Sequence, residues 1–162
     1  MTDHAATGRP VVLLLHGPNL DLLGEREPEV YGHETLADHV SAARATAAGV
    51  GLELEDLQSA SEAELVAAVH GARGRCAAIV VNPGAFTHYA WSLHDALAAF
   101  DGIVVELHLS NPNARDEWRH TSVIAPVATG TIAGFGGDGY PLAVLAVHRL
   151  LEVHPHPVEP PS

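Results

Sequence analysis

The chain contains no lysine, and all eight of its basic residues are arginine. Without a lysine amine the protein cannot form a Schiff base with a substrate or with pyridoxal phosphate, and it cannot complete a P-loop. The single cysteine, Cys76, excludes an internal disulfide. No apolar run approaches the roughly 18 residues that span a bilayer, and the polar residues 1–10 lack the apolar segment of a signal peptide. These absences predict a cytoplasmic protein that does not contact membranes.

Basic charge is also scarce. Eight basic residues against twenty acidic ones give a formal net charge of −12, which disfavours binding to nucleic acid. The 162 residues are 47% hydrophobic, enough for one ordinary domain with its own core. We expect a flexible tail over residues 1–9, a single catalytic domain over 10–153 and a disordered, proline-rich tail over 154–162.

Strand and helix patterns alternate along the chain. Apolar or alternating runs predict five strands, at 11–15, 52–57, 77–81, 103–109 and 123–127. Helical spacing predicts helices over 35–48, 61–70, 88–100 and 140–153, and the glycine-rich stretch 130–139 is expected to be a loop. The alternation predicts an α/β fold with a doubly wound parallel sheet, in which 52–57 lies near the edge. Ligands bind at the carboxyl ends of such strands, so we expect the chemistry just after residues 15, 81 and 108.

A polar segment after the first strand holds Arg26 and Tyr31. A phenol is a weak base at neutral pH unless a nearby cation favours its ionised form. Arg26 and Tyr31 can therefore act together as a base that removes a carbon-bound proton. The spacing is equally compatible with a surface arginine beside a tyrosine that only packs the loop.

The strand at 103–109 ends in polar residues. Glu106 and His108 are two positions apart, so they share one face of the strand. A carboxylate beside an imidazole orients it and favours its protonated form, which suits a general acid. The backbone N–H groups of Leu109 and Ser110, just past the strand, can hold a carboxylate. A buried structural histidine is the alternative interpretation.

Two further pairs can contact a ligand. Asn82 and His88 bracket the turn after the 77–81 strand, and they can hydrogen-bond a polyhydroxylated molecule or simply belong to a turn and a helix cap. Arg115 and Arg119 can share a face of a helical turn, where they would clamp an anion or merely face solvent.

Motifs for cofactors and metals are missing. The loop after the first strand has no G-x-G-x-x-G, so neither a flavin nor a dinucleotide is expected. The chain has twelve histidines, but no H-x-x-x-H pair lies on an expected helix near a third ligand. We therefore expect no cofactor and no metal site.

Four segments together resemble one family, the type II 3-dehydroquinate dehydratases. They are GPNLDLLGEREPEVYG at 17–32, NPGAFTH at 82–88, ELHLSNPNAR at 106–115 and ATGTIAGFGGDGYPLAV at 128–144. The resemblance implies a flavodoxin-like, three-layer α/β/α fold and a dodecamer built from trimers. It implies trans-elimination of water from 3-dehydroquinate to give 3-dehydroshikimate through an enolate, without metal or imine. The reaction would serve the shikimate pathway of aromatic amino acid biosynthesis or quinate catabolism.

The resemblance also implies roles for individual residues. By this likeness Tyr31 is the base that removes the proton alpha to the ketone, and Arg26 keeps its phenolate charged. Asn19 holds the water that stabilises the enolate oxygen. His108 is the acid that protonates the leaving hydroxyl, and Glu106 supports it.

The implied substrate contacts come from several segments. The resemblance assigns them to the side chains of Asn82, His88 and Arg119, and to the amides of Leu109 and Ser110, which would bind the substrate carboxylate. Asp95 matches a position that reaches the substrate of a neighbouring subunit. Arg115 matches a lid residue that closes over the bound ligand.

Several positions depart from the usual pattern of the family, among them Asp21, Ala60, Ser61 and three on one expected helix. Tyr89 and Trp91 stand where small residues are usual, and His94 stands where arginine is frequent. All three fall on a helix expected to face another subunit. Two alternative functions remain open at this stage: a non-catalytic, flavodoxin-like protein that binds a small anion, and a nucleotide- or flavin-binding module, which the absent phosphate loop disfavours.

Overall fold

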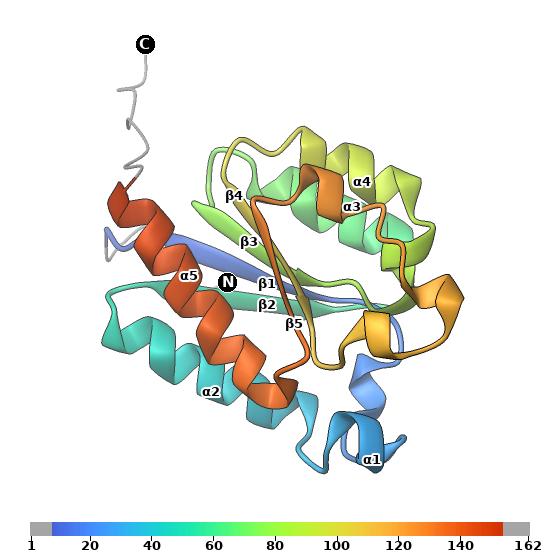
Figure 1. Cartoon of the computed structure of the whole chain (residues 1–162). Coiled ribbons are helices and arrows are strands. Elements are labelled where there is room, and N and C mark those ends of the chain that lie inside the picture. The colour runs from blue at the N-terminus through green and yellow to red at the C-terminus, as the bar shows by residue number, and fades with distance from the viewer. Residues whose placement is uncertain (1–7, 154–162) are drawn as a thin grey trace.

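A five-stranded parallel sheet forms the centre of the molecule (Figure 1). The computed structural model describes residues 8–153, so the expected tails fall outside the described residues except for Gly8 and Arg9. The strands are β1 (Val11–His16), β2 (Glu53–Gln58), β3 (Ala78–Asn82), β4 (Ile103–His108) and β5 (Gly130–Ala133). Their order in the sheet is β2-β1-β3-β4-β5, which confirms the parallel α/β architecture and the edge position of the second strand.

The central strands carry the continuous apolar runs. Every residue of β1 and β3 is buried, because helices cover both faces of the sheet at these positions. By contrast, β2 has a single buried residue, Leu54, and exposes both Asp56 and Leu57, as a strand at the sheet edge can. A parallel sheet buried on two faces explains why runs such as Val11 to Leu15 lack a period of two.

Two helices pack on each face of the sheet. One layer contains α2 (Leu36–Gly49) and α5 (Gly139–Val153), and the other contains α3 (Glu62–Ala72) and α4 (Trp91–Ala98) (Figure 1). A short helix, α1 (Pro28–Tyr31), lies outside these layers. A reciprocal capping box between Thr35 and Asp38 begins α2. The Ser61 hydroxyl accepts from the Glu64 amide and begins α3.

The fifth strand is not where the sequence predicted it. Residues 123–127 hold a 3-10 turn, Ala125–Val127, and β5 lies instead in the glycine-rich stretch that was expected to be a loop. Pro126 lacks an N–H, which argues against a strand at 123–127. The strand Gly130–Ala133 lies at the sheet edge and is only partly buried. It therefore needs no run of apolar residues, and the hydrophobic pattern of the sequence does not indicate it. The helix expected from residue 88 also begins later, at Trp91, because 84–88 form a 3-10 helix.

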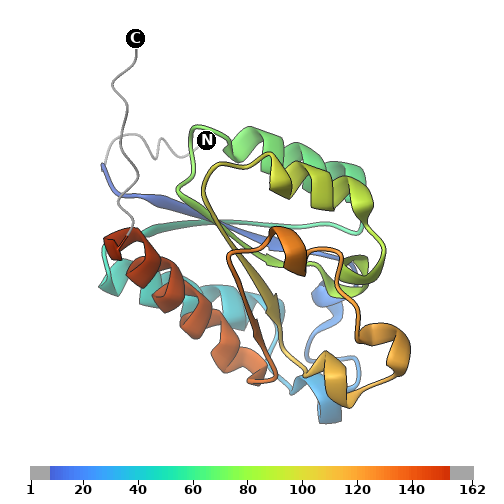
Figure 2. The same cartoon turned by 45° about the horizontal axis from the view of Figure 1, so that its top comes forward.

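The carboxyl ends of β1, β3 and β4 meet at one end of the sheet. Gly17 follows β1 directly, and a Cβ at this position would lie 2.1 Å from the Pro83 carbonyl oxygen, so only glycine permits the approach. Figure 2 shows α1 and the orange segment after β4 gathered at this end. The loops therefore converge where the sequence placed the chemistry. Within residues 8–153 no helix is long and apolar enough to cross a membrane.

Candidate active site

A pocket of about 90 Å³ opens at the carboxyl end of the sheet. It draws residues from the loops after β1, β3 and β4. Seven of the site residues expected from the sequence line it, namely Asn19, Arg26, Tyr31, Asn82, Leu109, Arg115 and Arg119.

Tyr31 sits between two arginines. The Arg115 Nη1 atom donates a hydrogen bond to the Tyr31 hydroxyl at 2.7 Å, and its guanidinium carbon lies 5.3 Å from the ring centroid. Arg26 lies 5.9 Å from the same centroid and forms an ion pair with Glu27 at 3.4 Å. The cation that contacts the phenol oxygen is therefore Arg115, although sequence reasoning paired Tyr31 with Arg26.

Local backbone geometry places these side chains. Asn19 has φ 68° and Glu27 has φ 42°, the only two residues other than glycine with positive φ within 8–153. Asparagine tolerates the left-handed region better than most residues, so Asn19 can turn the chain at the pocket wall. Pro28 then begins α1, whose four residues end on Tyr31.

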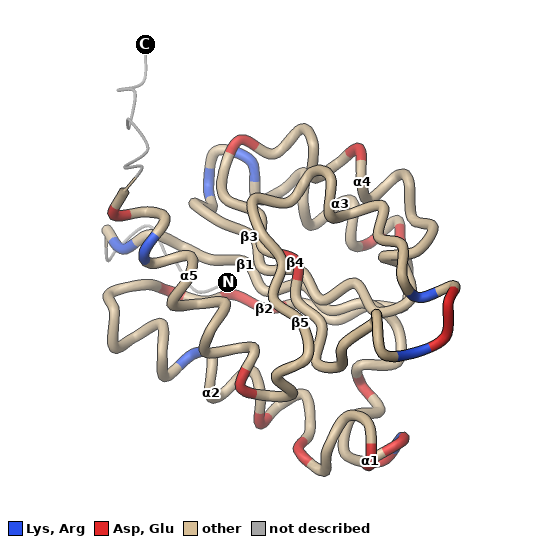
Figure 3. The backbone as a smooth tube through the Cα atoms, viewed as in Figure 1, with Lys and Arg blue, Asp and Glu red and all other residues tan. Residues whose placement is uncertain are grey.

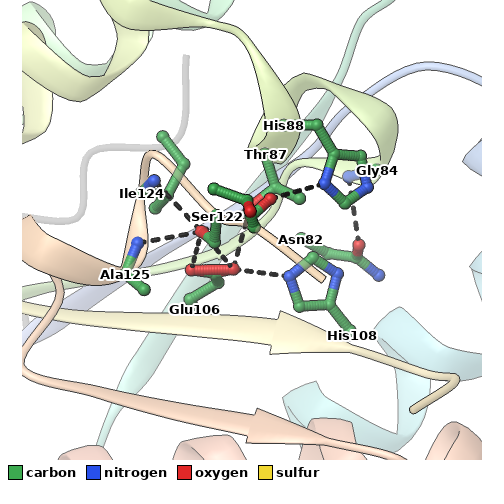
Figure 4. Close-up of polar contacts among 10 residues, drawn as sticks. Asn82, Gly84, Thr87, His88, Glu106, His108, Ser122, Ile124 and Ala125 are labelled. Atoms are coloured by element: carbon green, nitrogen blue, oxygen red, sulfur yellow. Dashed lines mark hydrogen bonds and ion pairs between the residues drawn. The ribbon is translucent and has the colours of Figure 1, made fainter. Parts of the chain in front are cut away.

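The buried carboxylate of Glu106 contacts the imidazole of His108, the expected general acid. Glu106 is 1% exposed and accepts a hydrogen bond from His108 Nε2 at 2.5 Å (Figure 4). Its carboxylate also accepts hydrogen bonds from the Thr87 hydroxyl at 2.9 Å and the Ser122 hydroxyl at 2.7 Å. Burial acts to raise the pKa of Glu106, but the hydrogen bonds and charge supplied by His108, together with the two hydroxyls, hold this pKa below its ordinary value. The structure thus brings Glu106 and His108 together as expected.

Two expected ligand contacts have structural partners. Asn82 Nδ2 donates to the hydroxyl of Tyr140 at 3.2 Å, and burial raises the pKa of Tyr140. The His88 ring donates from Nδ1 to the Thr121 carbonyl at 2.7 Å. Figure 4 shows His88 and Asn82 in the same close-up as the Glu106–His108 pair, with Asn82 Oδ1 accepting from the Gly84 amide.

The arginine pair does not share a helical turn. Arg115 follows the 3-10 turn Pro112–Ala114, and Arg119 ends a separate turn, Glu117–Arg119. Both guanidinium groups nevertheless line the pocket. Arg119 stacks on Trp118 at 4.1 Å, and its buried Nε makes no hydrogen bond within the described chain.

The pocket is cationic although the chain is acidic. Three of the eight arginines line it, while acidic residues are scattered over many elements in Figure 3. A concentration of guanidinium groups in a partly buried pocket favours a ligand that carries a carboxylate. Among residues 8–153 no group of three or more His, Cys, Asp or Glu side chains is arranged to hold a metal ion.

Other expected residues lie outside the pocket wall. Asp95 is on α4 with its side chain 84% exposed, and Ser110 accepts a long 3.4 Å hydrogen bond from Arg115. Sequence reasoning missed Thr87, Ser122 and Tyr140. Thr87 stands inside the NPGAFTH motif, but a hydroxyl gives no signal of its own until its acceptor is known.

Comparison with known proteins agrees with this geometry. The family model described as dehydroquinase class II matches residues 10–148. The chain belongs to this family. Solved structures of the same family are also similar to this chain. The type II dehydroquinase from Propionibacterium acnes superposes on it with a TM-score of 0.83 at 39% sequence identity. The match covers 86% of this chain and 96% of that chain. The flavodoxin-like fold implied by the sequence motifs is confirmed.

Curated members of the class II dehydroquinase family are similar over most of their length. The 3-dehydroquinate dehydratase of Desulforudis audaxviator is 54% identical over 86% of this chain and 93% of its own. The 3-dehydroquinate dehydratase 2 of Pseudomonas putida is 48% identical over 89% of this chain and 97% of its own.

Proposed function

We propose that this protein is a 3-dehydroquinate dehydratase, a hydro-lyase that eliminates water from 3-dehydroquinate to give 3-dehydroshikimate. Membership of the class II family supports this function, and the absence of lysine excludes a Schiff-base route in this chain. The observation that carries the proposal is the hydrogen bond from Arg115 to Tyr31 in an arginine-lined pocket, together with the Glu106–His108 pair at the carboxyl end of β4. The reaction is a step of the shikimate pathway, and quinate catabolism uses the same conversion.

Proton removal is the first step of the proposed reaction. The Tyr31 phenolate takes the proton alpha to the ketone, and the electron pair moves to the carbonyl oxygen as an enolate. Arg115 and Arg26 flank the phenol ring, and Arg115 donates a hydrogen bond to the phenol oxygen. Asn19, in the pocket wall, holds a water that donates to the enolate oxygen.

Loss of water completes the reaction. As the enolate re-forms the ketone, the carbon–oxygen bond to the leaving hydroxyl breaks and His108 supplies a proton to that oxygen. Glu106 compensates the positive charge of the imidazolium before transfer. The proton taken by Tyr31 returns to solvent and His108 is reprotonated, so atoms and charge balance over one turnover.

The remaining site residues bind the substrate in this proposal. Asn82, His88 and Arg119 hydrogen-bond its hydroxyls, and the amides of Leu109 and Ser110 bind its carboxylate. Arg115 acts as the lid residue. The position of Arg115 in the pocket wall, hydrogen-bonded to Tyr31, supports this role.

The assembly and location are part of the proposal. We propose a dodecamer built from trimers, in the cytoplasm, in which Asp95 contacts a neighbouring subunit's substrate. The high exposure of Asp95, Tyr89 and Trp91 on or beside α4 supports an interface there. Light scattering should give a mass twelve times 17.0 kDa, and a monomer would contradict the role of Asp95. One catalytic domain over 10–153 accords with the family match, which ends at residue 148.

The activity can be tested directly. Purified, metal-stripped protein is mixed with 3-dehydroquinate, and the ultraviolet absorbance of the conjugated enone product is followed with and without borohydride. Turnover that borohydride does not inhibit supports the proposed function. An intact protein that binds a substrate analogue without turnover would favour the binding-protein alternative.

A further inference from the structure

The Glu106 carboxylate receives hydrogen bonds from three separate segments of the chain. His108 donates from its own strand, Thr87 from the loop after β3, and Ser122 from the loop before β5 (Figure 4). Two of these donors are neutral hydroxyls that sequence motifs do not assign to the reaction. Thr87 is 1% exposed, so its hydroxyl is not available to solvent. The arrangement is therefore an internal one, behind the pocket wall.

Donor and acceptor counting fixes the direction of each hydrogen bond. The Ser122 oxygen accepts from the amides of Ile124 at 3.1 Å and Ala125 at 2.9 Å, which uses both of its acceptor positions. Its single proton therefore goes to Glu106, whose two oxygens lie 2.7 and 3.0 Å away. Thr87 lies 2.8 Å from Ser122 Oγ, but with that oxygen saturated its proton goes to Glu106.

These directions determine the state of His108. The two hydroxyl protons and the His108 ring stabilise the ionised carboxylate and hold the pKa of Glu106 below its ordinary value despite its burial. The ring atom facing it, His108 Nε2, must then carry a proton. Within residues 8–153 no other hydrogen bond to His108 is found, which leaves Nδ1 as the atom that can exchange a proton with a ligand.

We propose that Thr87 and Ser122 are positioning residues that orient Glu106 and thereby keep His108 protonated at Nε2, so that the proton given to the leaving hydroxyl is the one that the imidazolium carries on Nδ1. This inference rests on the proposed dehydratase function. The two residues do not touch the substrate. They act through the carboxylate, and their effect reaches the reaction only by way of the imidazole.

The hydroxyls are not needed to join the two loops. The Val123 amide donates to the Thr87 carbonyl at 2.7 Å, and the His88 and His94 rings donate to the carbonyls of Thr121 and Val123. Backbone acceptors therefore hold the segments together without either side-chain hydroxyl. Removing the Thr87 hydroxyl should change the Glu106 environment more than the loop structure.

The main test is a double-mutant cycle on kcat. Thr87→Val keeps the shape of the side chain and removes the donor, and we expect kcat to fall by about tenfold with KM within about twofold, as for loss of one hydrogen bond to a charged group. Thr87→Ser restores the hydroxyl and should recover most of kcat. In a Glu106→Gln background Thr87→Val should cost less than about twofold further. Thr46→Val is the matched control, because its hydroxyl donates only to the Ala42 carbonyl within α2.

Ser122 gives a second series. Ser122→Ala should lower kcat in the wild-type background and have little further effect with Glu106→Gln. Because Ser122 also caps two amides, thermal unfolding is measured in parallel. The positioning role would be overturned if Ser122→Ala lowered kcat only as far as it lowers thermal stability, and by the same factor in the wild-type and Glu106→Gln backgrounds.

The state of the ring can be observed without substrate. Magic-angle-spinning NMR of 15N-histidine-labelled protein, with the His108 signals assigned by their loss in His108→Asn, should show neutral His108 protonated at Nε2. In Thr87→Val the Nδ1–H form should appear beside it. A wild-type ring protonated at Nδ1, or additive kcat losses with Glu106→Gln, would overturn the inference. If the wild-type protein does not turn over 3-dehydroquinate, the proposed function fails, and the ring state still decides this inference.

Discussion

The Nη1 atom of Arg115 lies 2.7 Å from the hydroxyl oxygen of Tyr31, although the two residues are 84 positions apart in the chain. The contact joins the end of α1 to the loop after β4 across the mouth of the pocket. It gives the phenol oxygen a charged donor that Arg26, five residues away in sequence, does not supply here. The same guanidinium therefore lines the pocket and contacts the phenol oxygen.

Removing the Tyr31 hydroxyl should abolish most of the activity. Tyr31→Phe should lower kcat by about 10² to 10⁴, the range expected for loss of a general base, while a substrate analogue still binds. Steady-state kinetics and calorimetry of analogue binding measure the two effects. Tyr89→Phe, which alters an exposed tyrosine outside the pocket, is the control. Comparable turnover in Tyr31→Phe would disprove its role as the base.

The two arginines beside Tyr31 can be separated by mutation. Arg115→Gln removes a charged donor to the phenol oxygen, which is worth about 1.5–3 kcal/mol, so kcat should fall by roughly tenfold or more. Arg149→Gln, on the exposed side of α5, should leave kcat unchanged. Arg26→Gln measures the role that the family resemblance assigns to Arg26. If only Arg26→Gln lowers kcat, Arg115 is a lid residue alone.

Stability should fall as the pH drops from about 6.5 to 4. His16 is fully buried, and burial lowers its pKa from 6.5 to about 4, so in this interval the unfolded chain binds a proton that the folded chain does not. The free energy of unfolding should decrease by up to about 3 kcal/mol as the pH drops through this interval. Above pH 6.5, His16 should make no contribution to the pH dependence.

A histidine variant isolates this effect. Neither ring nitrogen of His16 meets a partner with hydrogen-bond geometry among the described residues, so His16→Leu should fold and show a shallower pH dependence in urea unfolding. Glu106 is present in both proteins, so its contribution to the pH dependence of unfolding is the same and drops out when the two slopes are compared. His33→Gln, at an exposed position, should keep the wild-type slope. An unchanged slope in His16→Leu would show that other groups cause the acid destabilisation.

A methyl group at Gly17 should break the approach of two loops. Gly17→Ala places Cβ 2.1 Å from the Pro83 carbonyl oxygen, which cannot yield without moving the end of β3. We expect a loss of roughly 1–3 kcal/mol or more in the free energy of unfolding. Gly71→Ala, in α3 with open space around the new methyl, should instead stabilise by about 0.5–1 kcal/mol. Equal stability of the two variants would contradict this reading of the Gly17 contact.

Much of the architecture could be predicted from the sequence. The apolar runs in β1 and β3 follow from burial on both faces, and the many polar residues of β2 follow from its place at the edge. The Glu106–His108 pair could also be predicted, because a period of two is a local property of any strand. These features depend on residues close in the chain, so the sequence by itself determined them.

Long-range contacts decided the rest. β5 gains its strand form by pairing with β4, and its own residues, exposed and glycine-containing, carry no strand pattern. Likewise, nothing near Tyr31 in sequence identifies Arg115, and nothing near Glu106 identifies Ser122 as its donor. A hydrogen bond depends on two atoms meeting within about 3 Å, and only the tertiary structure brings such distant residues together.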